Sequence, residues 1–182
     1  MKKAKDTDLL HELALERELF RREAERHFRV FLDYTQQNYS RQWFHTLIAE
    51  KCQALFEGTL PTNKLMIFVP PQNGKSEIVS RKFPAWALGR NPNTRLVGCS
   101  YSADLAQQFS RSIQRTIDAD CYKEVFPDTQ LNGGKQSGFI RNVDLFEVVG
   151  YGGFYKAVGV GGSLTGTPVD IGIIDDPVKD AL

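Results

Sequence analysis

The sequence predicts an α/β fold in which a mostly parallel sheet is flanked by helices. Short apolar runs typical of buried strands alternate with longer stretches of helical periodicity. The order strand then helix occurs twice in succession, over residues 64–89 and 94–117, which favours parallel strands with helices packed on them. A chain of 182 residues, with 41% hydrophobic and 25% charged residues, is long enough for one well-buried domain of this kind.

The first part of the chain predicts helices. Residues 6–34 contain neither Gly nor Pro and place Leu9, Leu13 and Phe20 at roughly helical spacings, so we expect one long amphipathic helix there. Its mixed charges fit a solvated face, and a helix that docks a partner is the alternative. A second helix is expected over residues 40–58, where Gly58 provides a C-terminal stop.

The first strand–helix unit follows these helices. Residues 64–69 (KLMIFV) are apolar and bounded by prolines, which predicts a buried strand. The helix expected from Ser76 contains Pro84, which should end or kink its first part. The second unit consists of a strand over residues 94–100 and a helix over residues 103–117.

After Pro127 the sequence becomes rich in glycine and strand-like. The runs at residues 145–149 and 155–160 are separated by glycines and predict a hairpin or meander. The apolar run at residues 170–175 predicts a final buried strand, which ends in two acids.

Composition excludes several classes of protein. The net charge is +1, so any DNA-binding surface would have to be a local patch. Three cysteines without a C-x-x-C pair argue against a disulfide framework or a zinc site and fit a reducing compartment. No signal peptide and no run of about 18 apolar residues is present, so we expect a chain that is neither secreted by such a signal nor membrane-spanning.

Residues 69–76 (VPPQNGKS) match the end of the phosphate-loop pattern G-x-x-x-x-G-K-[ST], with Val69 in place of the first glycine. Gly74 permits close approach of the backbone to a phosphate, Lys75 can reach the β- and γ-phosphates, and Ser76 can hold Mg²⁺. The expected strand before the loop and helix after it give the context in which backbone N–H groups converge on an anion. A Gly-Lys-Ser triplet after a strand also arises by chance.

The second motif is IGIIDDP at residues 171–177. A buried parallel strand would deliver both acids to its C-terminal edge, where ligands bind in open α/β sheets. Asp175 is placed to hold Mg²⁺ or its water, and Asp176 to act as general base on the attacking water. The alternative is a strand followed by an acidic turn. Together, in this order, the two motifs predict an ATPase that uses ATP and Mg²⁺.

Residues 69–111 and 159–180 resemble the ATPase part of tailed-phage terminase large subunits, the motors that package DNA. The resemblance spans residues 42–180 and implies a P-loop NTPase fold of the additional-strand type, in which ATP hydrolysis drives double-stranded DNA into a procapsid. It implies as partners a portal protein, a small terminase subunit and further copies in a ring, with no membrane, in the host bacterial cytoplasm.

The resemblance also assigns roles to residues. Lys75 and Ser76 match its Walker A lysine and magnesium-binding hydroxyl, and Asp175 and Asp176 match its Walker B pair, with Asp176 one methylene shorter than the glutamate of many relatives. Gln42 stands where related motors have a glutamine that recognises adenine. The alternative is that its neighbours Trp43 and Phe44 are core residues of the helix. The candidate nucleotide-binding residues are therefore Gln42, Pro71, Gln72, Asn73, Gly74, Lys75, Ser76 and Glu77.

A charge-stabilising arginine is not assigned. Gln72 and Thr167 stand where relatives often carry basic residues, which leaves Arg81, Arg90 and Arg141 as candidates from this subunit or a neighbouring one.

The segment after the second expected strand resembles an element that faces DNA in helicase-like motors. On that basis its exposed polar groups could contact phosphates; structural turn residues and a solvated basic face are the alternative. The residues concerned are Ser100, Tyr101, Ser102, Arg111 and Arg115.

The resemblance divides the chain into a helical segment, residues 1–39, and an ATPase domain, residues 40–182, that ends just after the Walker B pair, with no nuclease domain. We therefore expect no nuclease activity and at most weak hydrolysis from the isolated chain. Two alternatives remain: another helicase-like DNA-dependent ATPase, and a non-catalytic remnant or adaptor of the same fold.

Overall fold

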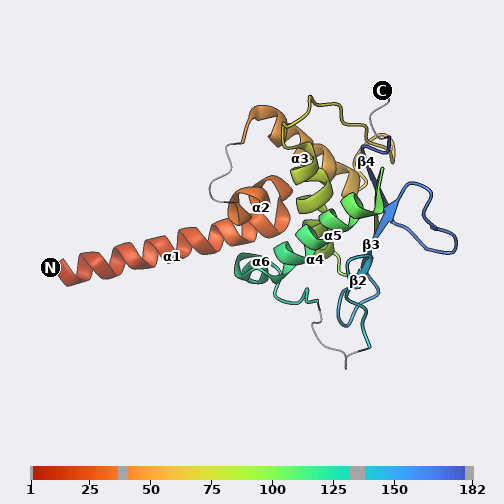
Figure 1. Cartoon of the computed structure of the whole chain (residues 1–182). Helices are drawn as coiled ribbons and strands as arrows, with labels where there is room; N and C mark the ends of the chain where they lie inside the picture. Colours follow the sequence, from red (N-terminus) through yellow and green to blue (C-terminus); the bar gives the residue numbers. More distant parts are fainter. Residues whose placement is uncertain (1, 37–40, 132–137, 179–182) are drawn as a thin grey trace.

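Strands and helices follow one another along the chain largely as the hydrophobic pattern predicts (Figure 1). The computed structural model describes residues 2–36, 41–131 and 138–178, with side chains from residue 10 onward. The helices are α1 (Lys2–Arg26), α2 (Phe28–Thr35), α3 (Trp43–Phe56), the π-helix η1 (Glu77–Lys82), α4 (Phe83–Arg90), α5 (Ala103–Asp118) and α6 (Asp120–Val125). The strands are β1 (Arg95–Ser100), β2 (Leu145–Glu147), β3 (Phe154–Gly159) and β4 (Ile171–Asp175). The expected boundary between residues 39 and 40 lies outside the described residues, as does the end of the chain after residue 178.

The four strands form one mixed sheet in the order β2-β3-β1-β4. Strand β1 is parallel to both β3 and β4, whereas β2 and β3 are antiparallel. This arrangement confirms the expected α/β class, the hairpin and the final strand. The register places Ser100 opposite Asp175, so β1 and β4 end at the same edge of the sheet.

The expected strand at residues 64–69 is wrong. The burial of its side chains alternates: Leu65 and Ile67 are half-buried, whereas Phe68 is 87% exposed. However, within the described residues it belongs to no ladder, and a small cavity lined by its apolar side chains and by β4 lies beside it. The continuous apolar run predicted a buried strand, but Met66 and Phe68 are exposed, and a strand also needs a neighbour within hydrogen-bonding reach.

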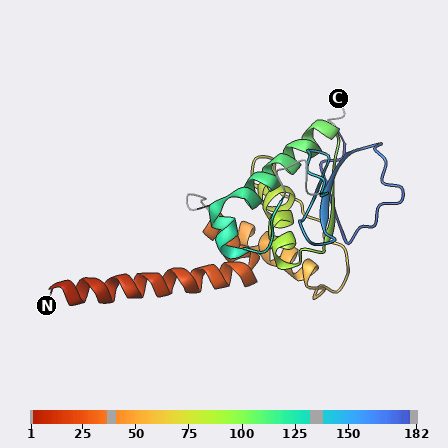
Figure 2. The same cartoon turned by 90° about the horizontal axis from the view of Figure 1, so that it is seen from below.

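Helices cover one face of the sheet, and the loop between β3 and β4 lies on the other side (Figures 1 and 2). Helix α5 packs on β1 and β3, and η1 contacts β4. The core between these helices is rich in aromatic rings: Trp86 is fully buried, with ring centroids 5.4 Å from Phe28 and 5.3 Å from Phe56. Residues from α2, α3 and α4 therefore share one hydrophobic core.

The single N-terminal helix expected over residues 6–34 is two helices, because the chain bends at His27. His27 has an extended backbone (φ −121°, ψ 115°), and the N–H of Phe28 donates to Oε1 of Gln53 at 2.9 Å. The bend turns Phe28 and Phe31 into the core, where both are fully buried. Sequence periodicity continues through His27, so it could not show this break.

Pro84 changes the type of the helix that contains it. A proline in a helix removes one N–H donor, and its ring crowds the carbonyl of the residue four positions earlier, here Ser80. The chain accommodates Pro84 by forming the π-helix η1 just before it, in which the N–H of Phe83 donates to the carbonyl of Ile78. In place of the expected kink, the helix widens locally into a π-helical turn. Ser80 lies in this turn, so the direction of its side chain differs from that in an α-helix.

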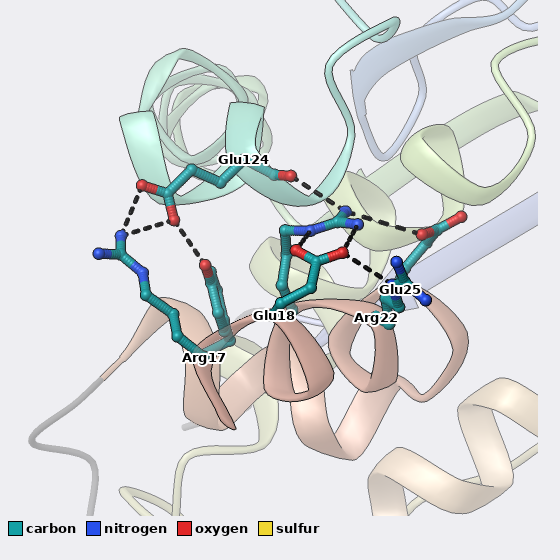
Figure 3. Close-up of polar contacts among 7 residues, drawn as sticks. Arg17, Glu18, Arg22, Glu25 and Glu124 are labelled. Carbon is teal, nitrogen blue, oxygen red and sulfur yellow. Dashed lines mark hydrogen bonds and ion pairs between the residues drawn. The ribbon is translucent and has the colours of Figure 1, made fainter. Parts of the chain in front are cut away.

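Helix α1 extends away from the rest of the molecule, and only its C-terminal part contacts the body (Figures 1 and 2). The attachment is polar as well as apolar. Arg17 contacts Glu124 of α6 at 2.8 Å, and the Tyr34 hydroxyl donates to the same carboxylate (Figure 3). Glu18 accepts hydrogen bonds from Arg21 and Arg22, which brace α1 along its own surface. No helix in the described ranges is both long and apolar enough to cross a membrane.

This attachment is expected to weaken in acid. Hydrogen bonds from Arg21 and Arg22 lower the pKa of Glu18 from 4.5 to about 2, and those from Tyr34 and Arg17 lower the pKa of Glu124. A carboxyl with a lowered folded-state pKa stabilises the fold fully above its ordinary value, and this contribution is lost as pH falls through the lowered pKa. The contribution of Glu124 to the attachment of α1 should therefore be lost as pH falls below the ordinary carboxyl pKa of 4.5, whereas protonation of Glu18 at lower pH affects contacts within α1 itself.

Trp86 can report this change, because its indole N–H donates to the carbonyl of Ala24 in α1 at 3.3 Å. We expect its fluorescence to shift in acid in a Trp43→Phe background, which removes the other tryptophan. Glu124→Gln should shift the emission toward the acid form already at neutral pH and flatten the profile. An unchanged profile in Glu124→Gln would show that the Glu124 carboxylate does not hold α1 in place.

Candidate nucleotide-binding site

Two residues of the loop at residues 69–76 have a left-handed backbone. Gln72 (φ 62°) and Gly74 (φ 74°) both lie in the left-handed region, which is rare for a residue with a side chain. The Asn73 amide donates to the carbonyls of Pro70 and Pro71 at 3.1 and 3.0 Å and closes the start of the loop. The two prolines thus replace, as turn formers, the glycine that the pattern lacks.

Backbone donors remain available in this loop. Within the described part of the chain, the N–H groups of Gln72, Asn73 and Gly74 make no hydrogen bond. The helix that follows begins at Lys75, and its first interior bond runs from the N–H of Ile78 to the carbonyl of Gly74 at 3.1 Å. Free N–H groups at the start of a helix, next to a left-handed turn, form a suitable site for a phosphate.

The end of strand β4 brings Asp175 and the next residue, Asp176, to the side chain of Lys75. The Lys75 ammonium lies 3.2 Å from Asp175 and 2.8 Å from Asp176, although about a hundred positions of sequence separate them. Asp175 is buried, whereas the side chain of Asp176 is 68% exposed. Asp176 also has a left-handed backbone (φ 45°). The two sequence motifs therefore meet in space.

The ammonium of Lys75 is neutralised by these acids. The hydrogen bond to Asp176, followed by the charge of Asp175, raises the pKa of Lys75, so the side chain stays protonated. An incoming phosphate would compete with Asp176 for the ammonium. A divalent cation would compete with the ammonium for the carboxylates. Because Asp176 is exposed, water screens its ion pair with Lys75, and the pair can be exchanged.

Ser80 is a site residue that the sequence did not reveal. Its hydroxyl donates to Oδ2 of buried Asp175 at 2.7 Å and fixes that carboxylate. Ser80 reaches β4 from the π-helix η1, whose wider turn changes the direction of its side chains. The one signal in the sequence was Pro84, because its ring disfavours an ordinary α-helical turn at the residues just before it, which include Ser80.

A family model decides the relationship of this chain to known proteins. The model describes the N-terminal part of the terminase large subunit of T4-like-virus type, and it matches residues 66–181, which is well over half of the chain. This chain belongs to the terminase large subunit family. The match includes the phosphate-loop segment and both acids of β4, and it supports a role in phage DNA packaging. No curated protein and no solved structure matches the chain.

Gln42, which the terminase resemblance links to adenine, lies at the start of α3 and is connected to the loop through His45. The backbone N–H of Gln42 donates to Nδ1 of His45 at 3.0 Å, so the proton of the ring is on Nε2. That nitrogen lies 2.9 Å from the carbonyl of Asn73 in the loop. The alternative in which Trp43 and Phe44 are core residues is wrong for Trp43, which is 76% exposed. Phe44 does pack against the core.

Two further expected nucleotide ligands differ in their surroundings. Ser76 lies in the first turn after the loop, and its hydroxyl makes no hydrogen bond to any described residue. Glu77 instead faces α2: its carboxylate accepts from Gln36 at 2.7 Å and from Arg81 at 3.0 Å. The structure thus brings Ser76 to the loop but directs the Glu77 carboxylate elsewhere.

The three candidate arginines contact neither Lys75 nor the acids of β4. Arg81 pairs with Glu77 and lies over the ring of Phe109. Arg90 lies over Trp86, and Arg141 pairs with Asp118. Within this one subunit, no cation besides Lys75 contacts the two acids in the described residues.

The segment expected to face DNA is partly structural. Ser100 is fully buried, and the Ser102 hydroxyl caps α5 by accepting from the N–H of Leu105 at 3.2 Å. Tyr101 is 39% exposed, and Arg115 forms no ion pair with a described residue. Thr167, at the other position where relatives often carry a basic residue, accepts a hydrogen bond from Lys156 at 3.0 Å.

The site suits magnesium held partly by phosphate. The described residues include no group of three or more His, Cys, Asp or Glu side chains that could hold a metal ion by themselves. Magnesium is usually bound by one or two carboxylates together with water and substrate phosphates. Asp175, held by Ser80 and close to the loop, together with the free hydroxyl of Ser76, fits such a site.

Proposed function

We propose that this protein binds ATP with Mg²⁺ at the loop of residues 69–76 and hydrolyses it to drive packaging of double-stranded DNA. The observation that carries the proposal is the bridge from Lys75 to Asp175 and Asp176. It joins a lysine that can bind phosphate to two acids that can hold Mg²⁺ and activate water, at the carboxyl edge of parallel strands, where α/β proteins bind ligands. Membership of the terminase family supports the packaging role.

The two acids suit different tasks in this mechanism. Asp175 is buried and fixed by Ser80, so it can hold the metal in one position. Bound there, Mg²⁺ would neutralise charge on the phosphate oxygens and polarise them. Asp176 is exposed, so water can reach it, and it would orient and deprotonate the attacking water.

Binding of ATP and freeing of the base are linked in this arrangement. Lys75 holds Asp176 while no phosphate is present, at 2.8 Å. When Lys75 turns to the β- and γ-phosphates, it releases the Asp176 carboxylate, which then becomes available to water. The base is therefore occupied in the absence of substrate and free in its presence.

The remaining charge in the transition state needs a further cation. Arg81, Arg90 and Arg141 are each engaged away from Lys75 within the subunit. We propose that a neighbouring copy in a ring supplies this charge, as arginine fingers do in related chemistry. The portal protein and the small terminase subunit would be further partners of such a ring in the host cytoplasm.

Calorimetric titration of the purified chain with ATP tests this function. We expect saturable binding with Mg²⁺ present, weakened about tenfold or more when EDTA removes the metal, because the phosphate charge then meets Asp175 and Asp176 without a bridging cation. Hydrolysis by the isolated chain should be weak and should rise with double-stranded DNA. No binding of ATP at millimolar concentration would refute the proposal and favour a non-catalytic adaptor.

A further inference from the structure

A second cluster of cationic and hydroxyl groups lies away from the phosphate loop. A cavity of about 250 Å³ opens where the end of α2, the end of η1, the C-terminal half of α5 and the start of α6 meet. Its lining residues are Thr35, Lys82, Ser112, Arg115, Thr116, Ala119 and Cys121. None of them lines the cavities around Lys75.

Lys82 is buried here without a counter-ion. The residue is only 9% exposed, and its ammonium donates to Oγ1 of Thr116 at 3.3 Å. No carboxylate of the described residues lies within 4.0 Å of it. An ammonium has three donors, and a buried cation is normally paired. Burial lowers the pKa of Lys82, and the charge of Glu77, which acts without direct contact, offsets only part of this effect.

The nearby acids are engaged elsewhere. Glu77, on the same helix, accepts hydrogen bonds from Gln36 and Arg81. Asp118 pairs with Arg141, and Asp120 is fully exposed to solvent and lies 3.9 Å from Lys123. Glu77 therefore acts on Lys82 only at a distance, and no carboxylate of the described residues pairs directly with Lys82 or Arg115 in this cavity.

Further donors surround the cavity. Arg115 is exposed and forms no ion pair with a described residue, and the Ser112 hydroxyl makes no hydrogen bond to one. The hydroxyls of Thr35 and Thr116 already donate to the carbonyls of Phe31 and Ser112, at 2.8 and 3.1 Å. Lys82, Arg115 and Ser112 thus remain as donors to a ligand, and all three favour an anion with several acceptor oxygens.

We propose that this cavity binds a small tetrahedral oxyanion of the inorganic phosphate class. Its volume lies below the roughly 300–1,000 Å³ of pockets that hold larger small molecules, which favours a small ion over a nucleotide. The bound oxyanion would neutralise Lys82 and hold α2, η1 and α5 together. This site does not depend on the function proposed for the loop.

Thermal unfolding of the full chain in sodium phosphate and in sodium chloride of equal ionic strength tests the proposal. A ligand that binds only the native state raises the melting temperature progressively with its concentration. We expect this rise in the wild-type protein and its loss in Lys82→Met, which keeps a side chain of similar length without charge. Titration calorimetry with inorganic phosphate should give a dissociation constant at least about tenfold higher for Lys82→Met than for the wild-type protein, because a charged hydrogen bond is lost.

Lys75→Ala is the matched control, because inorganic phosphate could also bind the loop. The effect of phosphate should persist in Lys75→Ala and diminish in Arg115→Gln, an exposed substitution that serves if Lys82→Met folds poorly. Loss of the effect in Lys75→Ala, or its persistence in both cavity variants, would overturn the proposal. So would a wild-type protein that phosphate leaves unaffected but whose binding to a duplex oligonucleotide requires Lys82.

Discussion

Lys75→Ala is expected to weaken ATP binding by about 10- to 150-fold. A hydrogen bond to a charged group contributes about 1.5–3 kcal/mol, and each 1.4 kcal/mol corresponds to a factor of ten in affinity. The ammonium of Lys75 is the one cation that contacts Asp175 and Asp176 in the described residues, so no neighbouring side chain can replace it. Calorimetric titration of both proteins with ATP and Mg²⁺ measures the difference.

Asp176→Asn is the matched variant for this prediction. It removes the ion pair that holds Lys75 at 2.8 Å but leaves the ammonium in place. ATP binding should therefore be retained or become tighter, whereas hydrolysis should fall by about 10²- to 10⁴-fold, the usual contribution of a general base. If Asp176→Asn weakens binding as much as Lys75→Ala does, the pair holds the structure together and the assigned roles are wrong.

Trp86→Ala is expected to destabilise the protein by about 3–5 kcal/mol, the usual result of replacing a buried Trp by Ala. The ring is fully buried and contacts Phe28 of α2, Phe56 of α3 and Phe83 of α4. A typical domain has a total stability of about 5–15 kcal/mol, so this one substitution removes a large part of it. Urea unfolding followed by circular dichroism should show a lower midpoint.

Trp43→Ala provides the comparison for that experiment, since it removes the same side chain from a position that is 76% exposed. Its effect should stay within about 0.5 kcal/mol, as for most surface substitutions. If the two variants lowered the free energy of unfolding by similar amounts, burial of the Trp86 ring would not be what stabilises the fold.

The sequence predicted strands correctly where a segment with the hydrophobic pattern of a strand also has a neighbouring strand to pair with. Strand β1 and helix α5 lie within one or two residues of their expected positions, and the glycine-separated runs form the antiparallel pair β2 and β3. Residues 64–69 have the same kind of pattern but no hydrogen-bonded neighbour in the described structure, because pairing depends on distant parts of the chain. Helix α6 was missed, since its six residues are too few to show a period.

The candidate site could be predicted in part. Gly74, Lys75 and the acids of β4 follow from motifs whose spacing along a strand or loop is local, and the parallel sheet brings them together. Ser80 and the contact of His45 with Asn73 could not be predicted. The first depends on a π-helical turn and the second on how α3 packs beside the loop, and neither leaves a periodic trace in the sequence.

The left-handed backbones of Gln72 and Asp176 have a consequence for how the site is made. Such conformations are unfavourable for residues with side chains by about 1–3 kcal/mol each, and they persist where the surroundings impose them. A free peptide with the sequence VPPQNGKS would therefore relax to another backbone shape. The left-handed backbone of Gln72 is therefore a property of the folded domain that constrains these eight residues, and the motif alone does not specify it.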